Sequence, residues 1–314
     1  MLQYLVVLLD DTSISYCHYK NNKTQKRLIN IDDLKTGIFF AMKENLRIQF
    51  VYPAYELPNN YKELIETIDH SKIVPNDYNG AADVIVYNDW DELVNIPNPN
   101  NETSYILQSS KFSLFEHYQK LDMILRKLIY LNIVLTDIET FRDKEFDIYK
   151  ETLTQMSDIV GRLYMQGLSP QLNLITSRLM LDKMNNCNAG NENITLAPNG
   201  KFYICPAFYL NDEKDYIGDL ENGLNIKNKK LYQIDYAPIC RRCDAYQCNR
   251  CVYLNRKMTL EVNTPSHEQC VVAHLERNAS QYLLNKMRTE GAFLPNKQIK
   301  EITYLDPFDI IKRF

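Results

Sequence analysis

Seven of the eight cysteines in this 314-residue chain lie between positions 187 and 270. Thiolates are the preferred ligands of iron–sulfur clusters and of structural zinc, and a Cys-x-x-Cys turn aims two sulfurs at one metal. The spacing therefore predicts a metal-binding region, and at this point it leaves both iron–sulfur clusters and zinc open. The pattern is Cys187, then Cys205, then Cys240-x2-Cys243-x4-Cys248-x2-Cys251, and finally Cys270.

A zinc ribbon or a set of free thiols would account for these cysteines less well. A zinc ribbon would use only the four between 240 and 251 and leave the rest structural. Scattered free thiols are disfavoured because four cysteines within twelve residues is far above background. Residues 1–11 are typical of a buried first strand and not of an export signal, so we expect a cytoplasmic location, where thiols stay reduced.

Two local features bear on how ligands are placed. Asn199-Gly200 is a strong turn signal between strand-like residues, so the segment 195–205 is predicted to be a hairpin that positions Cys205. The five histidines are scattered along the chain. His267 lies three residues before Cys270 and is the best candidate among them for an additional ligand.

The elements that must carry these residues alternate between strands and helices through the first 180 residues. Strand-like runs occur near 4–9, 47–52, 82–87, 104–108, 131–136 and 171–176, with a further candidate at 70–75. Apolar side chains step by three and four along 114–128 and 146–163, which predicts two amphipathic helices. Alternating strands and helices predict a parallel α/β sheet, either a partial barrel or an open doubly wound sheet.

Beyond residue 185 helical periodicity disappears until Cys270, after which a helix is predicted over 272–286 and a strand over 299–305. The chain is 45% hydrophobic and 24% charged with a net charge of −4, which is typical of a globular protein. This charge gives no reason to expect nucleic acid or an anionic membrane as a partner. Asp137 and Glu139 follow a predicted strand, and a helix-capping or solvated role explains them better than catalysis does.

The cysteine pattern resembles the SPASM domain of radical SAM peptide maturases. Two middle spacings are one residue shorter here than is usual in that family. The resemblance implies two [4Fe–4S] clusters, a distal one held by Cys240, Cys243, Cys248 and Cys270 and a proximal one held by Cys187, Cys205 and Cys251. The proximal set then has three thiolates, so its fourth ligand must come from another side chain, a small thiol or a substrate cysteine.

The resemblance extends to the CXXX repeat peptide maturase family. It is carried by the opening segment 5–19, by 42–53 and by 240–270, and it covers nearly the whole chain. It implies a degenerate partial (β/α)6 radical-SAM-like barrel over 1–184, a SPASM-like cluster domain over 185–271, and a C-terminal helix and tail over 272–314. The implied partners are a radical SAM enzyme and a ribosomal peptide with repeated Cys-x-x-x units.

One motif of radical SAM enzymes is absent from the sequence. Their Cys-x3-Cys-x2-Cys loop follows the first barrel strand, but here only Cys17 stands there, with Asn21 and Thr24 at the other two places. We therefore expect no 5′-deoxyadenosyl radical from this chain alone, and we interpret Cys17 as an ordinary, partly buried thiol. The predicted function is maturation of the peptide together with a separate radical SAM enzyme. The alternative is a non-catalytic scaffold stapled by iron–sulfur clusters or zinc.

Overall fold

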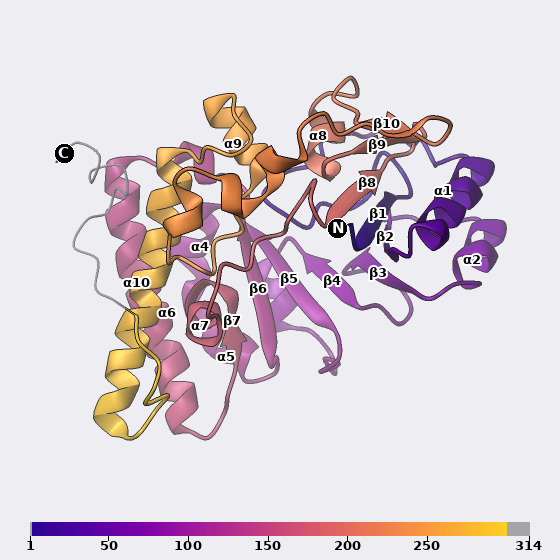
Figure 1. Cartoon of the computed structure of the whole chain (residues 1–314). Coiled ribbons are helices and arrows are strands. Elements are labelled where there is room, and N and C mark those ends of the chain that lie inside the picture. Colours follow the sequence, from indigo (N-terminus) through magenta and orange to yellow (C-terminus); the bar gives the residue numbers. More distant parts are fainter. Residues whose placement is uncertain (1, 300–314) are drawn as a thin grey trace. The chain divides into compact units, whose positions relative to one another are not determined.

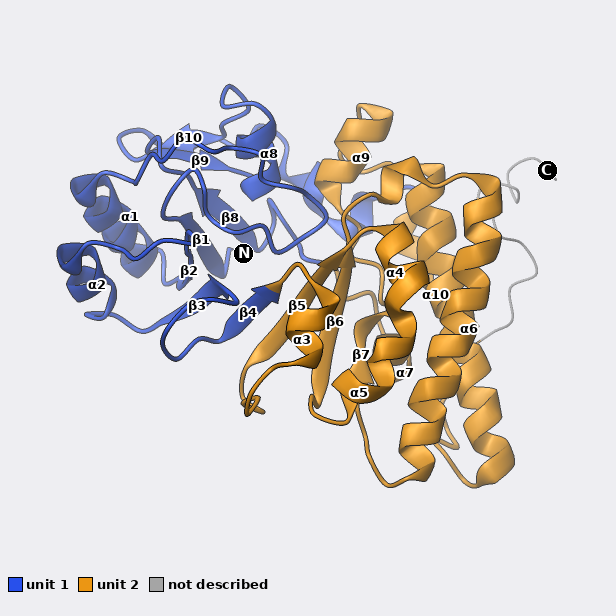
Figure 2. Ribbon diagram, turned by 180° about the vertical axis from the view of Figure 1, so that it is seen from behind, with its two compact units in different colours: residues 1–86, 187–238 blue, residues 87–186, 239–314 orange. Residues whose placement is uncertain are grey.

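The computed structural model describes residues 2–299 and divides the chain into two compact units (Figure 2). Unit 1 comprises Met1–Val86 and Cys187–Pro238, and unit 2 comprises Tyr87–Asn186 and Ile239–Phe314. Each unit therefore combines an early and a late segment of the chain. The division into ranges 1–184, 185–271 and 272–314 stays a prediction, and the strand predicted over 299–305 lies outside the described residues except for Ile299.

Unit 1 is built on a mostly parallel sheet with strand order β11-β10-β9-β8-β1-β2-β3-β4. The first strand pairs in parallel with β2 and β8, and Tyr4 lies opposite both Arg47 and Asn193. An antiparallel hairpin of β8 and β9 turns at Gly200, whose positive φ of 72° suits glycine, so the predicted hairpin is confirmed. The strands are β1 (Tyr4–Leu8), β2 (Arg47–Val51), β3 (His70–Pro75), β4 (Val84–Tyr87), β8 (Asn193–Leu196), β9 (Lys201–Tyr203), β10 (Gly218–Asp219) and β11 (Gly223–Leu224).

Helices α1 (Ile31–Lys43) and α2 (Asn59–Ile65) cover one face of this sheet, and α8 (Pro206–Asn211) follows the hairpin (Figure 1). The first helix begins where the Asn30 side chain accepts a hydrogen bond from Asp32 N, which satisfies one otherwise unpaired amide. Its apolar stripe packs with Phe50, Ile194 and Phe202 into a single core cluster. Burial of this cluster fixes the carboxyl ends of β1, β2 and β3, from which the loops of unit 1 emerge.

Unit 2 contains a small parallel sheet packed with long helices. Its strands are β5 (Ser104–Ser109), β6 (Tyr130–Leu135) and β7 (Gln171–Leu172). The two longest helices, α6 and α10, lie side by side (Figure 2), and buried Ser157 of α6 donates to the Ala279 carbonyl of α10. The helices are α3 (Trp90–Val94), α4 (Lys111–His117), α5 (Leu121–Leu125), α6 (Asp143–Met165), α7 (Asn173–Met180), α9 (Val252–Thr259) and α10 (His267–Glu290).

Most of the predicted elements are confirmed, and the strand predicted over 171–176 is wrong. Only Gln171 and Leu172 form β7, and helix α7 begins directly afterwards. The Asn173 side chain explains the change, because its Oδ1 accepts from Ile133 N and its Nδ2 donates to Ile133 O. The Asn173 side chain thus takes the hydrogen bonds at the edge of β6 that a further strand residue would make. The backbone after Leu172 can then form helix α7.

The helix predicted over 114–128 is interrupted. It consists of α4, a 3-10 turn at Tyr118–Lys120, and α5. Leu114, Leu121 and Leu125 are nevertheless buried, so the apolar stripe predicted the packing face but not the break. The other long helices begin earlier or end later than predicted, since α6 starts at Asp143 and α10 runs from His267 to Glu290.

Candidate metal centre

The loop from Cys240 to Cys251 lies wholly in unit 2 and folds into tight turns. A 3-10 turn at Cys240–Arg242 opens it, with Cys243 N donating to Cys240 O at 3.1 Å. A second turn is closed by Cys248 N donating to Ala245 O at 3.0 Å, and the loop ends where α9 begins. The first of these turns joins Cys240 to Cys243, as the Cys-x-x-Cys spacing predicts.

Backbone amides point at three of the sulfurs in this loop. Ala245 N donates to Cys243 Sγ at 3.4 Å and Arg250 N donates to Cys248 Sγ at 3.3 Å. The Cys251 sulfur caps α9 by accepting from Leu254 N at 3.5 Å. Amide donors of this kind stabilise a thiolate, and they fix the direction in which a ligand presents its lone pairs.

Three of the thiols form an electrostatically coupled group. Burial raises the pKa of Cys243 to about 11, and the neighbouring Cys240 contributes to this increase. The pKa of Cys248 is also raised, first by burial and then by Cys240 and Cys243. Without a cation these sulfurs are therefore neutral thiols at pH 7. A bound metal would displace their protons, because its charge replaces the missing solvation.

Buried polar contacts hold the loop against its own unit. Arg277 on α10 is fully buried, and its Nη2 lies 2.7 Å from Asp244 Oδ2. Arg178 on α7 donates through Nε to Asp244 O at 2.7 Å, and the Gln247 amide donates to Ala273 O. The residues beside Cys243 and Cys248 are thus tied to two helices, which makes the loop a preorganised support.

Helix α10 brings a histidine to the loop that the sequence interpretation did not single out. His274 is buried, and its Nε2 lies 3.5 Å from Cys243 Sγ. Burial lowers the pKa of His274 to about 4, so its imidazole is neutral at pH 7. The histidine predicted as the best additional ligand, His267, instead packs edge-on against Phe146 at a ring distance of 6.0 Å. The sequence could have indicated His274, because it lies four residues after Cys270 and this spacing puts both on one face of a helix.

The remaining cysteines are divided between the units. Cys187 and Cys205 belong to unit 1 and Cys251 to unit 2, so the proximal ligand set stays a prediction. Within unit 1, the pKa of Tyr16 is raised by burial and then by the nearby thiols of Cys17, Cys205 and Cys187. Cys17 therefore shares its surroundings with two predicted ligands, which its isolation in the sequence did not indicate.

The donor chemistry of the Cys240–Cys251 loop fits a thiophilic metal centre. Buried thiols, amide N–H groups aimed at sulfur and a neutral imidazole are the groups that iron–sulfur and zinc sites use. Across residues 2–299, no three His, Cys, Asp or Glu side chains already converge on one point as a metal-binding group. The turns and the helix contacts hold Cys240, Cys243 and Cys248 in one loop, and their assignment as metal ligands stays a prediction.

The loop after β1 is held by side-chain hydrogen bonds and ion pairs. Asn21, at the place of the second cysteine in the radical SAM motif, donates through Nδ2 to Asp11 O at 2.7 Å and to Ser13 O at 2.9 Å. Arg27 pairs with Asp11 at 3.0 Å and with Glu213 at 2.6 Å. At one place of that motif a side-chain amide thus stands where a thiolate would be, and ion pairs of neighbouring residues hold the same loop.

Asp137 and Glu139 have structural contacts. Asp137 Oδ1 accepts from Lys111 N at 2.9 Å, in the first turn of α4, and Glu139 pairs with Lys257 of α9 at 2.6 Å. The Asp137 contact agrees with the expected capping role, whereas Glu139 is mostly buried and ion-paired and is neither a cap nor solvated. Neither carboxylate provides an indication of catalysis.

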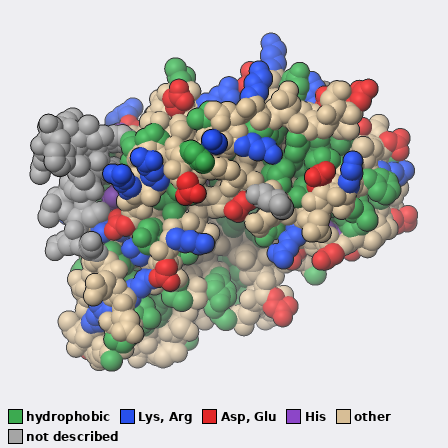
Figure 3. All heavy atoms as spheres, viewed as in Figure 1, with side chains coloured by type: hydrophobic (Ala, Val, Ile, Leu, Met, Phe, Trp, Pro, Cys, Tyr) green, Lys and Arg blue, Asp and Glu red, His purple; other side chains and the backbone are tan. Residues whose placement is uncertain are grey.

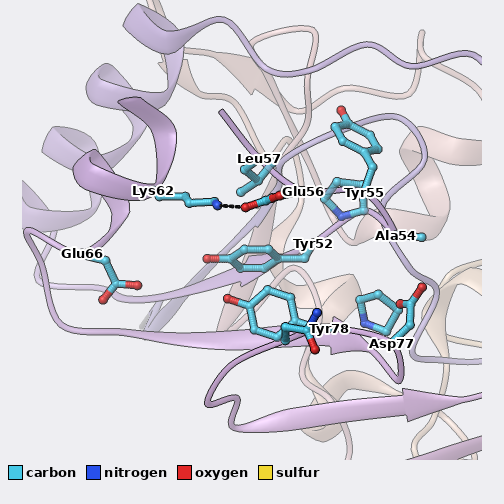
Figure 4. A pocket seen from close by; sticks show the side chains of 12 residues that line it. Tyr52, Ala54, Tyr55, Glu56, Leu57, Lys62, Glu66, Asp77 and Tyr78 are labelled. Atoms are coloured by element: carbon cyan, nitrogen blue, oxygen red, sulfur yellow. Dashed lines mark hydrogen bonds and ion pairs between the residues drawn. The ribbon is translucent and has the colours of Figure 1, made fainter. Parts of the chain in front are cut away.

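A pocket of about 520 Å³ opens in unit 1 beyond the carboxyl ends of β2 and β3 (Figure 4). The rings of Tyr52 and Tyr78 form one wall, edge to face at 5.3 Å, and Tyr55 is tied to buried Asp10 by a hydrogen bond of 2.8 Å. Three carboxylates and one lysine line the rim, namely Glu56, Glu66, Asp77 and Lys62, and Glu66 pairs with Lys72. Lys62 pairs with Glu56.

The fold matches solved structures of anSMEcpe. One with bound AdoMet and Cp18Cys peptide is 12% identical and covers 91% of this chain and 99% of that one, with a TM-score of 0.61. A histidine-tagged form with bound AdoMet covers 94% of this chain and 98% of that one, at 10% identity and a TM-score of 0.60. The predicted radical-SAM-like α/β barrel fold is thereby confirmed.

No protein-family model matches the chain. No curated protein matches it either. Among residues 2–299, no helix has the length and apolar character needed to cross a membrane. Positive and negative side chains are interspersed over the face seen in Figure 3, which agrees with the small net charge.

Proposed function

We propose that this protein takes part in the maturation of a ribosomally synthesised peptide with Cys-x-x-x repeats, binding the peptide and cooperating with a separate radical SAM enzyme. In this proposal the cysteines of the chain hold auxiliary [4Fe–4S] clusters. The observation that carries it is the combination of a peptide-modifying enzyme's fold with a preorganised thiol loop. Structures with that fold hold Cp18Cys and Kp18Cys peptides.

The need for a separate radical enzyme follows from the loop after β1. Asn21 and the Asp11–Arg27 pair fill this loop with amide and carboxylate groups, and Cys17 is its single thiol. Three thiolates leave one iron of a [4Fe–4S] cluster open to chelate S-adenosylmethionine, and this loop cannot supply them. The radical must then come from another chain, and this protein contributes the peptide site and the clusters.

The tyrosine pocket supports a role in binding the peptide. Tyrosine faces attract aromatic and cationic side chains, and the carboxylate of Asp77 at the rim favours a basic or amine-bearing segment. Lys26 already lies 4.1 Å from the centroid of the Tyr55 ring, so a cation is compatible with this surface. We propose that the pocket receives a side chain of the peptide next to the residue that is modified.

At the thiol loop, the protein's own residues would hold and orient the metal. Cys240, Cys243 and Cys248 supply thiolates after losing their protons, and the amides of Ala245 and Arg250 stabilise the negative sulfurs. Asp244 and Arg277 keep the loop on α10. When bound, an iron–sulfur cluster supplies electron transfer here, and an open iron that could grip a peptide thiol belongs to the proximal set with its three thiolates.

Two measurements test the proposed function. A fluorescent synthetic peptide with Cys-x-x-x repeats is titrated with the full chain. Tyr78→Ala should weaken binding about tenfold because one aromatic contact is lost. Asp77→Asn should weaken it about threefold, in keeping with a partly exposed charge. Tyr236→Ala, at an exposed tyrosine of the same unit, is the matched control and should leave binding unchanged.

The second measurement is the mass of the peptide after incubation with the radical SAM enzyme, S-adenosylmethionine and reductant. The modified product should form when the metal-loaded chain is present and should fall strongly with the Cys243→Ser variant. The same product in the absence of this chain would contradict the proposal. Product that forms equally well with metal-free chain would instead identify it as a docking scaffold.

A further inference from the structure

Arg250 stands between Cys248 and Cys251 at the end of the thiol loop. Its side chain is only 2% exposed, although arginine is among the residues that are least often buried. Its φ of 43° lies in the left-handed region, which residues other than glycine rarely adopt. Burial of a cation and strain in the backbone are both unfavourable, so a specific interaction must hold Arg250 in this conformation.

Two groups of Arg250 donate hydrogen bonds to sulfur. Its backbone amide donates to Cys248 Sγ at 3.3 Å, and its guanidinium donates to the sulfur of Cys240. Burial raises the pKa of Cys240, whereas the charge of the guanidinium and its hydrogen bond lower this pKa. One residue thus stabilises the thiolate form of two predicted ligands of the distal centre.

Two other buried arginines of unit 2 have a different task at the loop. Arg277 pairs with Asp244 at 2.7 Å, and Arg178 donates to the carbonyl of the same residue at 2.7 Å. These contacts attach the loop to helices α10 and α7. Arg250 lies within the loop and acts on the sulfurs themselves, so its effect depends on what the sulfurs bind.

Charge explains why a cation is useful at this place. The resemblance gives the distal centre four thiolates, and a divalent metal or a [4Fe–4S] cluster with four thiolates has a net negative charge. One electron from an external reductant makes a cluster more negative still. Hydrogen bonds to the sulfurs and the net charge of the surroundings help to set the potential of such a centre. In a buried site a nearby cation has a larger effect than in water.

We propose that Arg250 balances the charge of the distal metal centre, through its guanidinium on Cys240 and its amide on Cys248. It is a positioning residue, because it acts through these sulfurs and makes no bond to the metal. The inference deepens the proposed function and rests on the metal centre that it contains. Loss of the guanidinium should weaken metal binding and make the centre harder to reduce, whereas loss of an exposed cation from the same loop should change neither.

The first test is a redox titration followed by electron paramagnetic resonance, on the full chain reconstituted anaerobically with iron and sulfide. In Arg250→Gln the ratio of reduced to oxidised cluster at a fixed potential should fall about tenfold for one of the two clusters, as loss of a hydrogen bond to a charged group implies. This change is about 59 mV for a one-electron couple. The other cluster should keep its midpoint potential.

Two further variants show whether charge is the cause. Arg250→Lys keeps the cation and should recover most of the shift. Arg242→Gln makes the same change at an exposed position of the loop and should alter the ratio by less than about twofold. Equal midpoint potentials in the natural chain and Arg250→Gln, or equal shifts in Arg250→Gln and Arg242→Gln, would overturn the inference.

A Co²⁺ titration of the metal-free chain separates this inference from the proposed function. Arg250→Gln and Arg250→Gly should both weaken Co²⁺ binding about tenfold, although glycine suits the positive φ and keeps the amide donor. Natural affinity in Arg250→Gly would show that the backbone alone matters and would refute the inference. Iron uptake with unchanged midpoints in Arg250→Gln refutes the inference alone. A tenfold loss of Co²⁺ affinity in a chain that takes up no iron refutes the cluster function alone, and a chain that binds neither metal refutes both.

Discussion

The loop after β1 and the loop that leads to α9 are both irregular, and each contains cysteine. The first is closed by oxygen and nitrogen, with the Asn21 amide on two backbone carbonyls and Arg27 between two carboxylates. The second is fixed to its helices by Asp244 and Gln247, and three of its thiols accept backbone amides while Cys243 also lies beside the His274 imidazole. The first loop is thus closed by its own polar groups, whereas the second gathers thiols that the proposed metal would bind.

The largest expected effect comes from removing metal. A chelator should lower the hydrogen-exchange protection of residues 239–252 by about 100-fold or more, because metal binding and local folding share one free energy. The loop at 10–28 should change little. Equal loss of protection in both loops would contradict the proposed difference between them. The measurement is amide exchange by mass spectrometry on the full chain, before and after chelation.

The next prediction concerns the buried ion pair that holds the thiol loop on α10. Arg277→Ala removes a fully buried cation that pairs with Asp244, and it should cost about 3–5 kcal/mol in the free energy of unfolding. Lys286→Ala on the same helix is the control, because it breaks a half-exposed pair with Asp158 and should cost under about 1 kcal/mol. Urea unfolding at equal metal loading measures both free energies. Equal losses in the two variants would contradict the role of the Arg277–Asp244 pair in holding the loop.

The closure of the loop after β1 predicts a smaller change. Asn21→Ala removes two hydrogen bonds to backbone carbonyls and should destabilise the protein by about 1–3 kcal/mol. Metal content should stay the same. Asn22→Ala at the exposed neighbouring position should lie within about 0.5 kcal/mol of the natural chain. A fall in bound metal in Asn21→Ala would show that the two loops are coupled.

The smallest effect is a dependence on pH. Burial tends to raise the pKa of Glu213, but hydrogen bonds from Lys23 and Arg27 outweigh it and hold this pKa below its usual range. Its stabilising contribution is therefore present above the unfolded pKa and lost as pH falls through the folded one. The partners are partly exposed, so the contribution is under about 1 kcal/mol. Stability of the natural chain and Glu213→Gln should converge in acid, and a constant difference would contradict this.

The sequence predicted elements with strong periodicity and missed those set by single side chains. Alternating strands, the helix at α6 and the hairpin at Asn199-Gly200 follow from local pattern. The replacement of a strand by α7 depends on Asn173 bonding to Ile133, a contact between residues 40 positions apart. No local rule anticipates such a contact.

The candidate site divides in the same way. Spacing predicts Cys240, Cys243 and Cys248 as ligands, because short intervals within one loop constrain geometry directly, and this assignment stays a prediction. Spacing did not identify His274, because proximity to Cys243 arises from packing of α10 against a loop about thirty residues earlier. Cys17 was likewise interpreted in isolation, whereas its thiol lies near Tyr16 together with those of Cys187 and Cys205.

The most direct test of the central claim is the amount of iron, acid-labile sulfide and zinc per chain after anaerobic reconstitution, with electron paramagnetic resonance on the reduced sample. We predict about eight irons and as many sulfides, as two [4Fe–4S] clusters contain, and two overlapping signals. Cys243→Ser should lose about half of the iron. One or two zincs with no iron would contradict the account and leave a zinc-stapled scaffold.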